Sequence, residues 1–147
     1  MKTKHSITRF ERSLIALIAA TLLAIPFVFA AGEPENVSGV AASPISETSV
    51  GLSWNSAKAA NGGLVNHYRV YYGTTSVQAA GEGDYDFQAD TTNNNTSYAA
   101  SGLAPGTTYY FSVTAVDGAG LESEAYSLEA SATTLGESAD GETPAGR

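Results

Sequence analysis

Few residues in this sequence are suited to acid–base or nucleophilic chemistry. After residue 31 the chain contains one histidine, His67, at the start of an alternating segment. A serine nucleophile needs a nearby base, and neither a Gly-x-Ser-x-Gly elbow nor a His-Glu-x-x-His motif occurs. A lone histidine in a strand is more often a surface residue than a catalyst. We therefore predict a protein that is not an enzyme, with no catalytic, cofactor-binding or metal-binding residue.

Three aspartates nevertheless raise the question of calcium. Asp84, Asp86 and Asp90 carry carboxylate oxygens, which are the ligands that calcium prefers. The calcium loop of a helix-loop-helix site needs a glycine at its sixth position and a glutamate at its twelfth, and neither is present. Alternating aspartates also discourage pairing between exposed sheet edges. We interpret them as solvated edge charges, with a weak calcium site as the alternative.

The elements that would position any site are most clearly marked between Leu103 and Ala115. Pro105 and Gly106 form a turn. After this turn the chain alternates with a period of two. The alternating residues begin with a threonine and are otherwise aromatic or apolar, and in a strand they share one face. These residues are Thr107, Tyr109, Phe111, Val113 and Ala115. The pattern predicts a strand over 107–117 with a buried face.

The same period of two recurs between turn residues from Glu33 to Thr134, and helical periodicity is absent there. The other predicted inward residues are Val40, Ala42, Val50, Leu52, Trp54, Tyr68, Val70, Tyr72, Tyr98 and Ala100, together with Leu128 and Ala130 in a strand over 127–134. Phe87 marks a short fourth strand. Regularly spaced short strands separated by turns are typical of a β-sandwich or barrel.

The spacing of Leu103, Pro105, Thr107 and Tyr109 resembles the signature of fibronectin type III domains. Trp54 fits the second strand of that family. The stripe at 68–72 fits the third strand, and the resemblance covers roughly residues 34–135.

The resemblance implies an all-β fold: a seven-stranded, immunoglobulin-like sandwich of two antiparallel sheets with Trp54 at the centre of the core. It also implies a tyrosine corner, in which the Tyr109 ring is buried and its hydroxyl bonds backbone near the preceding turn.

Loops and outward strand positions are where such a scaffold carries function. Some relatives place an Arg-Gly-Asp integrin site between the last two strands, but the corresponding segment here, 117–120, has no arginine. Tyr71 and Tyr110 are expected to point outward from neighbouring strands of one sheet. Two such aromatics could stack against a sugar or a partner chain, so they form the candidate partner-binding surface. Scattered surface aromatics without a function are the alternative.

The N-terminal sequence has the pattern of an export signal. Four basic residues occur in the first thirteen, an apolar run follows from Leu14 to Ala31, and Val28-Phe29-Ala30 offers a cleavage site. We predict a signal peptide over 1–30, a domain over 31–135 and an acidic, disordered tail over 136–147. The alternative is an uncleaved anchor, in which residues 14–31 span the membrane. In both cases the rest of the chain is exported, and it is secreted, periplasmic or on the cell surface.

The charge and cysteine content of the chain limit the kinds of partner that it can bind. Residues 31–147 contain three basic and fourteen acidic residues, a formal charge of −11. Such a surface lacks the clustered Lys and Arg that nucleic-acid binding needs. The absence of cysteine means that packing alone must hold the fold. A monomer is expected.

We predict a non-catalytic extracytoplasmic binding or adhesion module that contacts an unidentified protein or polysaccharide. The alternative is a membrane-tethered structural component of the cell surface with an uncleaved N-terminal helix. No cofactor is expected.

Overall fold

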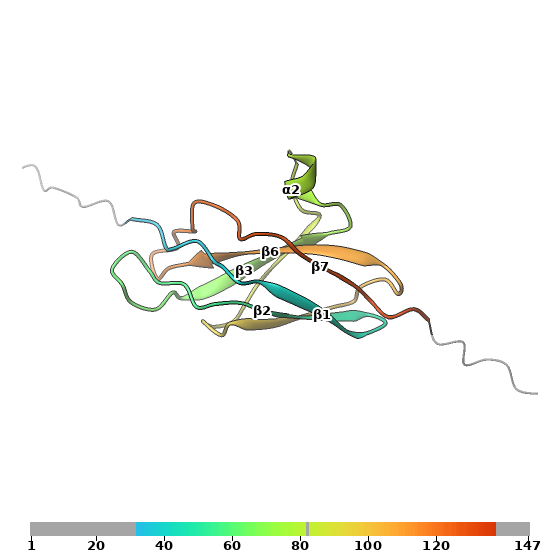
Figure 1. Cartoon of the computed structure of the whole chain (residues 1–147). Coiled ribbons are helices and arrows are strands. Elements are labelled where there is room, and N and C mark those ends of the chain that lie inside the picture. The colour runs from blue at the N-terminus through green and yellow to red at the C-terminus, as the bar shows by residue number, and fades with distance from the viewer. Residues whose placement is uncertain (1–31, 82, 138–147) are drawn as a thin grey trace, which may run out of the picture. The chain divides into compact units, whose positions relative to one another are not determined.

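The computed structural model describes residues 32–81 and 83–137 of the 147-residue chain. These residues form seven strands and one short helix (Figure 1). The strands are β1 (Ala41–Ser46), β2 (Ser49–Ser53), β3 (His67–Gly73), β4 (Phe87–Asp90), β5 (Ser97–Ser101), β6 (Thr108–Val116) and β7 (Ala130–Thr133). The helix, α2 (Val77–Ala80), lies in the connection between β3 and β4 and projects from the sheets.

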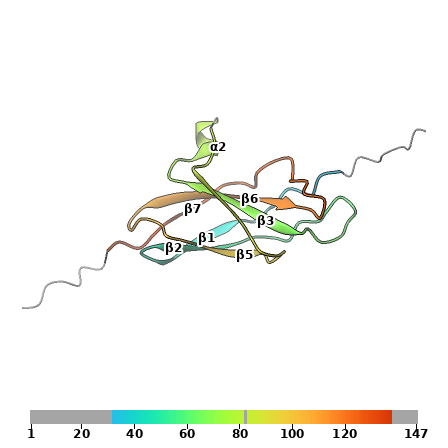
Figure 2. The same ribbon diagram turned by 180° about the vertical axis from the view of Figure 1, so that it is seen from behind.

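The strands form two antiparallel sheets that pack against each other. One sheet has the order β1-β2-β5, and the other has the order β4-β3-β6-β7. Figure 2 shows the two layers from behind, with β5 and β2 in the lower layer and β3 and β6 in the upper one. The prediction of a seven-stranded immunoglobulin-like sandwich is confirmed.

The core lies between the sheets and is built largely from the alternating residues that the sequence pattern predicted, together with Val37, Ala57 and Val65, which it did not predict. Trp54, directly after β2, packs edge-on against Tyr68 with ring centroids 5.3 Å apart. Tyr68 and Val70 from β3 and Phe111 from β6 are fully buried. Burial of one such large apolar side chain stabilises a fold by about 1.5–3 kcal/mol. These contacts hold together a chain that contains no disulfide.

The tyrosine corner has the geometry that the resemblance implied. The Tyr109 ring is buried, and its hydroxyl accepts a hydrogen bond of 3.1 Å from the backbone N–H of Ala104. Gly106 has a φ of 60°, a left-handed conformation that glycine adopts without steric cost. The bond therefore ties the turn before β6 to the core side of that strand.

The prediction for the last strand is partly wrong. β7 covers only Ala130–Thr133, and the side chain of Leu128, expected to point inward, is 85% exposed. Ser127 is buried in its place: its Oγ accepts a hydrogen bond of 3.0 Å from the N–H of Val113. A side-chain oxygen replaces a backbone partner there, so the alternation of faces is interrupted before β7 begins.

Helix α2 was not predicted, because four residues are too few to show helical periodicity. Ser76 caps its N-terminus by accepting a hydrogen bond of 3.0 Å from the N–H of Ala79. Gly81, with a φ of 73°, ends it.

The predicted signal peptide over 1–30 lies outside the described residues, as does the predicted tail except for Gly136 and Glu137. Within the described part of the chain, no helix has the length and apolar character needed to cross a membrane.

Candidate functional site

The outer face of the four-stranded sheet carries the two tyrosines chosen from the sequence. The register places Tyr71 of β3 opposite Ser112, and Tyr110 of β6 opposite Gly73. The two tyrosines are therefore diagonal neighbours on the face away from the core, and both are half-buried. No ring contact joins them among the described aromatic pairs, and a role for them in partner binding stays a prediction.

Tyr71 instead belongs to a cluster with two tyrosines from loops. Its ring centroid lies 4.9 Å from that of Tyr126 and 6.1 Å from that of Tyr85. The rings of Tyr85 and Tyr126 lie 5.4 Å apart and nearly perpendicular, at 85°. Tyr85 comes from the segment before β4, and Tyr126 from the segment between β6 and β7. We call Tyr71, Tyr85 and Tyr126 the tyrosine cluster.

The carboxylate of Glu122 fixes Tyr71 in this cluster. It accepts hydrogen bonds from the Tyr71 hydroxyl at 2.6 Å, the Thr114 hydroxyl at 2.6 Å and the Arg69 Nη1 at 2.8 Å. The other side of the Arg69 guanidinium donates to both carboxylate oxygens of Asp90, at 2.6 and 3.2 Å. Charge-assisted bonds of this kind are the stronger ones in proteins, so Tyr71 has one fixed position.

A second carboxylate, that of Glu129, holds Tyr85 and the start of α2. Its oxygens accept hydrogen bonds from the Tyr85 hydroxyl at 2.7 Å, the N–H of Val77 at 3.0 Å and the Ser76 hydroxyl. Gln78 adds two bonds to the same segment, donating to the carbonyl of Ser127 at 2.6 Å and accepting from the N–H of Glu129 at 3.0 Å. These bonds attach the β3–β4 connection, which contains α2, to the segment 127–129 before β7.

The environment keeps the three phenols neutral. Burial, followed by the hydrogen bond to Glu122, raises the pKa of Tyr71 to about 12. Burial also raises the pKa of Tyr85, with a further contribution from its hydrogen bond to Glu129. The pKa of Tyr126 is raised by burial and then by the negative charges of Asp84 and Glu122. These shifts move the titration of all three phenols further above physiological pH.

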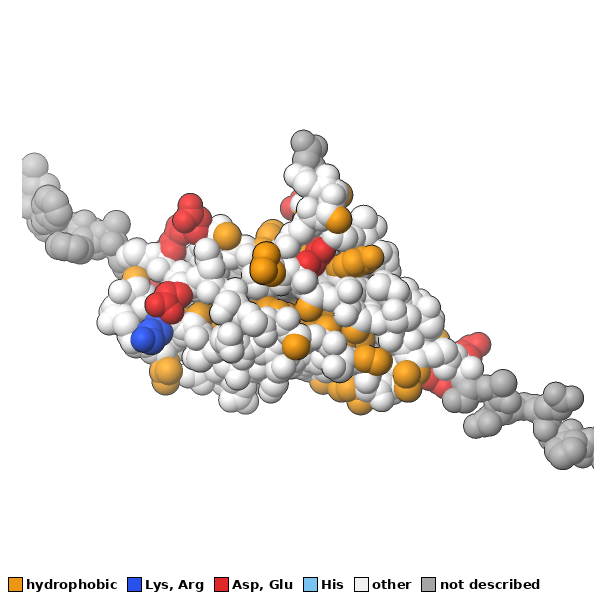
Figure 3. Space-filling view, viewed as in Figure 1, with side chains coloured by type: hydrophobic (Ala, Val, Ile, Leu, Met, Phe, Trp, Pro, Cys, Tyr) orange, Lys and Arg blue, Asp and Glu red, His pale blue; other side chains and the backbone are white. Residues whose placement is uncertain are grey.

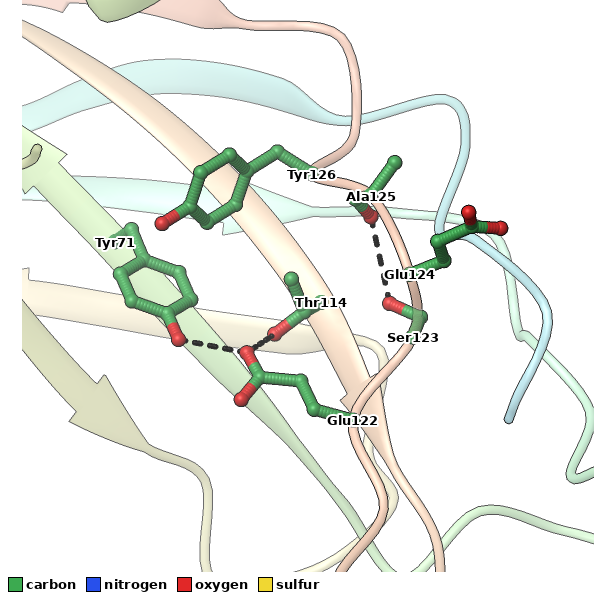
Figure 4. A pocket seen from close by; sticks show the side chains of 7 residues that line it. All are labelled: Tyr71, Thr114, Glu122, Ser123, Glu124, Ala125 and Tyr126. Carbon is green, nitrogen blue, oxygen red and sulfur yellow. Dashed lines mark hydrogen bonds between the residues drawn. The ribbon is translucent and has the colours of Figure 1, made fainter. Parts of the chain in front are cut away.

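Two grooves meet at the tyrosine cluster. The first has a volume of about 480 Å³ and lies between Tyr71 and Tyr126, over Thr114 and the segment 122–125 (Figure 4). Figure 4 shows Glu122 directed towards the Tyr71 hydroxyl, whereas the side chain of Glu124 points away from it. Tyr126 is 40% exposed, so its ring is accessible from the groove.

The second groove, of about 370 Å³, is lined by Tyr71 and Tyr126 and by the segment 84–88, which includes Tyr85 and the carboxylates of Asp84 and Asp86. A partner seated in either groove would contact Tyr71 and Tyr126.

The structure separates the three aspartates of the calcium hypothesis. Asp90 binds Arg69, which lowers the pKa of its carboxyl. Asp86 accepts a long bond of 3.4 Å from the N–H of Thr74. Among the described residues, no group of three or more His, Cys, Asp or Glu side chains is arranged to hold a metal ion. His67 is part-buried, with its Nδ1 2.9 Å from Asn66 Oδ1 and its Nε2 3.9 Å from Asp90.

Both the sequence and the fold connect this chain to known proteins. Over residues 33–131 the sequence matches the family described as the fibronectin type III domain. The chain belongs to this family. Domains of the fibronectin type III family are in general non-catalytic modules.

Three relatives are informative. An Fn3-like protein from Clostridium thermocellum is 31% identical with a TM-score of 0.55, and the match covers 70% of this chain and 95% of that one. Exoglucanase B from Cellulomonas fimi is 37% identical over 92 residues, which cover 63% of this chain and 7% of that enzyme. Chitinase ChiA74 from Bacillus thuringiensis is 26% identical with a TM-score of 0.53, over 70% of this chain and 14% of that one. The chain thus spans only a small part of either enzyme.

Sequence reasoning found Tyr71 but missed the residues that surround it. Tyr85 and Tyr126 lie in loops, where no periodicity indicates the direction of a side chain. Glu122 and Glu129 look like ordinary surface acids in the sequence. The one available signal was the position of Tyr85 between Asp84 and Asp86, an aromatic residue between charges in a loop.

Proposed function

We propose that this protein is a non-catalytic binding module that works outside the cytoplasm and contacts a separate protein or polysaccharide through the tyrosine cluster. The observation that carries this proposal is the pair of grooves meeting at Tyr71 and Tyr126. Tyrosine combines a large apolar ring with a polar tip, and it is enriched among residues that dominate binding energy. Hydrogen bonds to Glu122 and Glu129 hold Tyr71 and Tyr85 in place before any partner arrives, and Tyr126 packs against both rings, which reduces the entropy lost on binding.

The relatives support a role at polysaccharide-rich surfaces. Two of them are named for enzymes that act on polysaccharides, an exoglucanase and a chitinase. The basic and then apolar N-terminal sequence supports export. Together these features favour a location where the domain meets extracellular polymers or envelope proteins.

The test compares retention of the protein, expressed from the full-length chain, on insoluble cellulose, on chitin and on immobilised envelope proteins. Tyr126→Ala removes an exposed ring of the cluster and should weaken retention on the preferred surface by at least about tenfold, as loss of an aromatic anchor does. Leu64→Ala is the matched control, because Leu64 is also exposed but lies in the loop between β2 and β3.

Equal retention of both variants and the parent on every surface would show that the cluster binds nothing in this set. Tyr110→Ala, measured in the same series, decides whether the diagonal neighbour of Tyr71 extends the surface. Melting temperatures of all variants exclude loss of folding as the cause.

A further inference from the structure

The grooves at the tyrosine cluster have an electrostatic character that narrows the choice of partner. Their lining includes the carboxylates of Asp84, Asp86 and Glu122. The cations among the described residues are Lys58 and Arg69. Lys58 lies in the loop between β2 and β3, outside both linings, and Arg69 is bound on both sides by Glu122 and Asp90. Within residues 32–81 and 83–137, the groove linings therefore present carboxylates and no Lys or Arg side chain.

The surface beyond the grooves is also negatively charged. On the face shown in Figure 3, Lys and Arg side chains occupy a small area at one end, whereas acidic side chains appear at several places. Burial first, and then the charges of Asp84 and Glu122, raise the pKa of Tyr126, and the charge contribution places this ring within their field. This field attracts a positively charged group and repels an anionic one.

The angles between the three rings suit the binding of a small group, such as a guanidinium, better than the binding of an extended sugar chain. A sugar chain lying on a protein surface is best matched by aromatic rings that share one plane. Here the Tyr126 ring stands at 72° to that of Tyr71 and at 85° to that of Tyr85. The three rings therefore do not share one plane, and a guanidinium in a groove can lie over the face of one ring and donate to a neighbouring carboxylate.

We propose that the tyrosine cluster receives an arginine side chain from a basic segment of a partner protein. Asp84 and Asp86 line the second groove and are the carboxylates we assign to the guanidinium, Asp86 in addition to its long bond from the N–H of Thr74. The Glu122 carboxylate already accepts three hydrogen bonds. This inference rests on the proposed binding function and selects a protein partner over a polysaccharide.

The test uses three probes with the protein expressed from the full-length chain and labelled at its tyrosine rings for NMR. The probes are a short peptide of alternating glycine and arginine, the same peptide with neutral citrulline in place of arginine, and a cello-oligosaccharide. The arginine peptide should shift the ring signals of Tyr71, Tyr85 and Tyr126 saturably. Its citrulline counterpart, which differs mainly in charge, should bind about tenfold more weakly.

Variants locate the interaction. The double variant Asp84→Asn with Asp86→Asn keeps side-chain size and should weaken arginine-peptide binding about fivefold. Glu33→Gln removes a charge outside both groove linings and should leave binding unchanged.

Three results would overturn the inference: equal binding of the citrulline peptide, equal weakening by Glu33→Gln, or ring signals that no arginine peptide moves. If the cello-oligosaccharide alone shifts the rings, the arginine site is wrong while the proposed binding function stands. If no probe shifts the rings, the arginine site is again wrong, and retention of the Tyr126→Ala variant decides the proposed function independently.

Discussion

Glu122 and Glu129 show how single side chains organise this surface. Each carboxylate accepts hydrogen bonds from several donors on separate segments, and each holds one tyrosine of the cluster by its hydroxyl. On the core side, Trp54 and Tyr109 have comparable importance for a different reason: one fills volume between the sheets, and the other links a turn to its strand. Residue-scale effects should therefore divide into loss of packing and loss of a hydrogen bond.

Paired substitutions in the core test this division. Tyr109→Phe keeps the ring but removes the hydroxyl that accepts from Ala104, and it should lower the free energy of unfolding by about 1 kcal/mol. Trp54→Ala leaves a large cavity beside Tyr68 and should cost roughly 3–5 kcal/mol. Urea denaturation measures both, and a Trp54→Ala protein as stable as the parent would contradict the position of the indole in the core.

Among the elements, the segment between β6 and β7 differs most from a regular strand. The N–H groups of Ser123 and Ser127 donate to the carbonyls of Ala115 and Val113, so the segment runs beside β6. The hydroxyl oxygen of Ser127 accepts a hydrogen bond from the N–H of Val113, and the next residue, Leu128, is exposed to solvent. This irregular course brings Tyr126 over Tyr71 and places Glu129 at the start of α2.

Ser127→Ala tests the importance of that irregular element. The substitution leaves the buried N–H of Val113 without its partner, which should lower the free energy of unfolding by about 1–3 kcal/mol. Ser131→Ala, at an exposed position in β7, is the control and should lie within about 0.5 kcal/mol of the parent. Thermal and urea unfolding give both values. If the two variants are equally stable, the N–H of Val113 does not depend on the Ser127 hydroxyl as its hydrogen-bond partner.

For the molecule as a whole, stability depends on two sheets packed without covalent cross-links and on an acidic surface, on which Arg69 is paired with Asp90 and Glu122. The carboxyl groups of Asp90 and Glu129 have lowered pKa values in the folded protein. For Asp90 the first cause is the hydrogen bond from Arg69. For Glu129 burial opposes ionisation, but the bonds from Ser76, Tyr85 and two backbone N–H groups outweigh it.

A pH profile of stability follows from these shifts. Because the folded pKa values of Asp90 and Glu129 are lowered, their stabilisation is complete above their unfolded values, near about 4. It should be lost as pH falls through the lower folded values. Tyr71 acts in the opposite direction: its raised pKa adds stability below pH about 10, which is lost as pH rises towards about 12.

Melting temperatures between acid and alkaline pH measure this profile. Asp90→Asn should be less stable than the parent at neutral pH, and it should lose less stability than the parent as pH falls. Tyr71→Phe should lose less stability than the parent as pH rises from about 10 towards about 12. A parent whose stability is independent of pH in both ranges would contradict the assigned ion pair and phenol environment.

The sequence by itself determined an all-β fold of short strands, because period-two alternation and turn residues act over short distances along the chain, and the resemblance to a known family selected the sandwich. The stripe of β3 was readable in that way, whereas the central position of Trp54 and the tyrosine corner followed from the resemblance to the fibronectin type III family. The partners of Tyr71 were not readable in either way: Glu122 is 51 residues away in sequence, and Tyr85 is 44 residues from Glu129. Only the tertiary structure brought them together, because the paths of irregular loops over the sheet depend on hydrogen bonds such as those of Ser127 and Gln78, which no local pattern encodes.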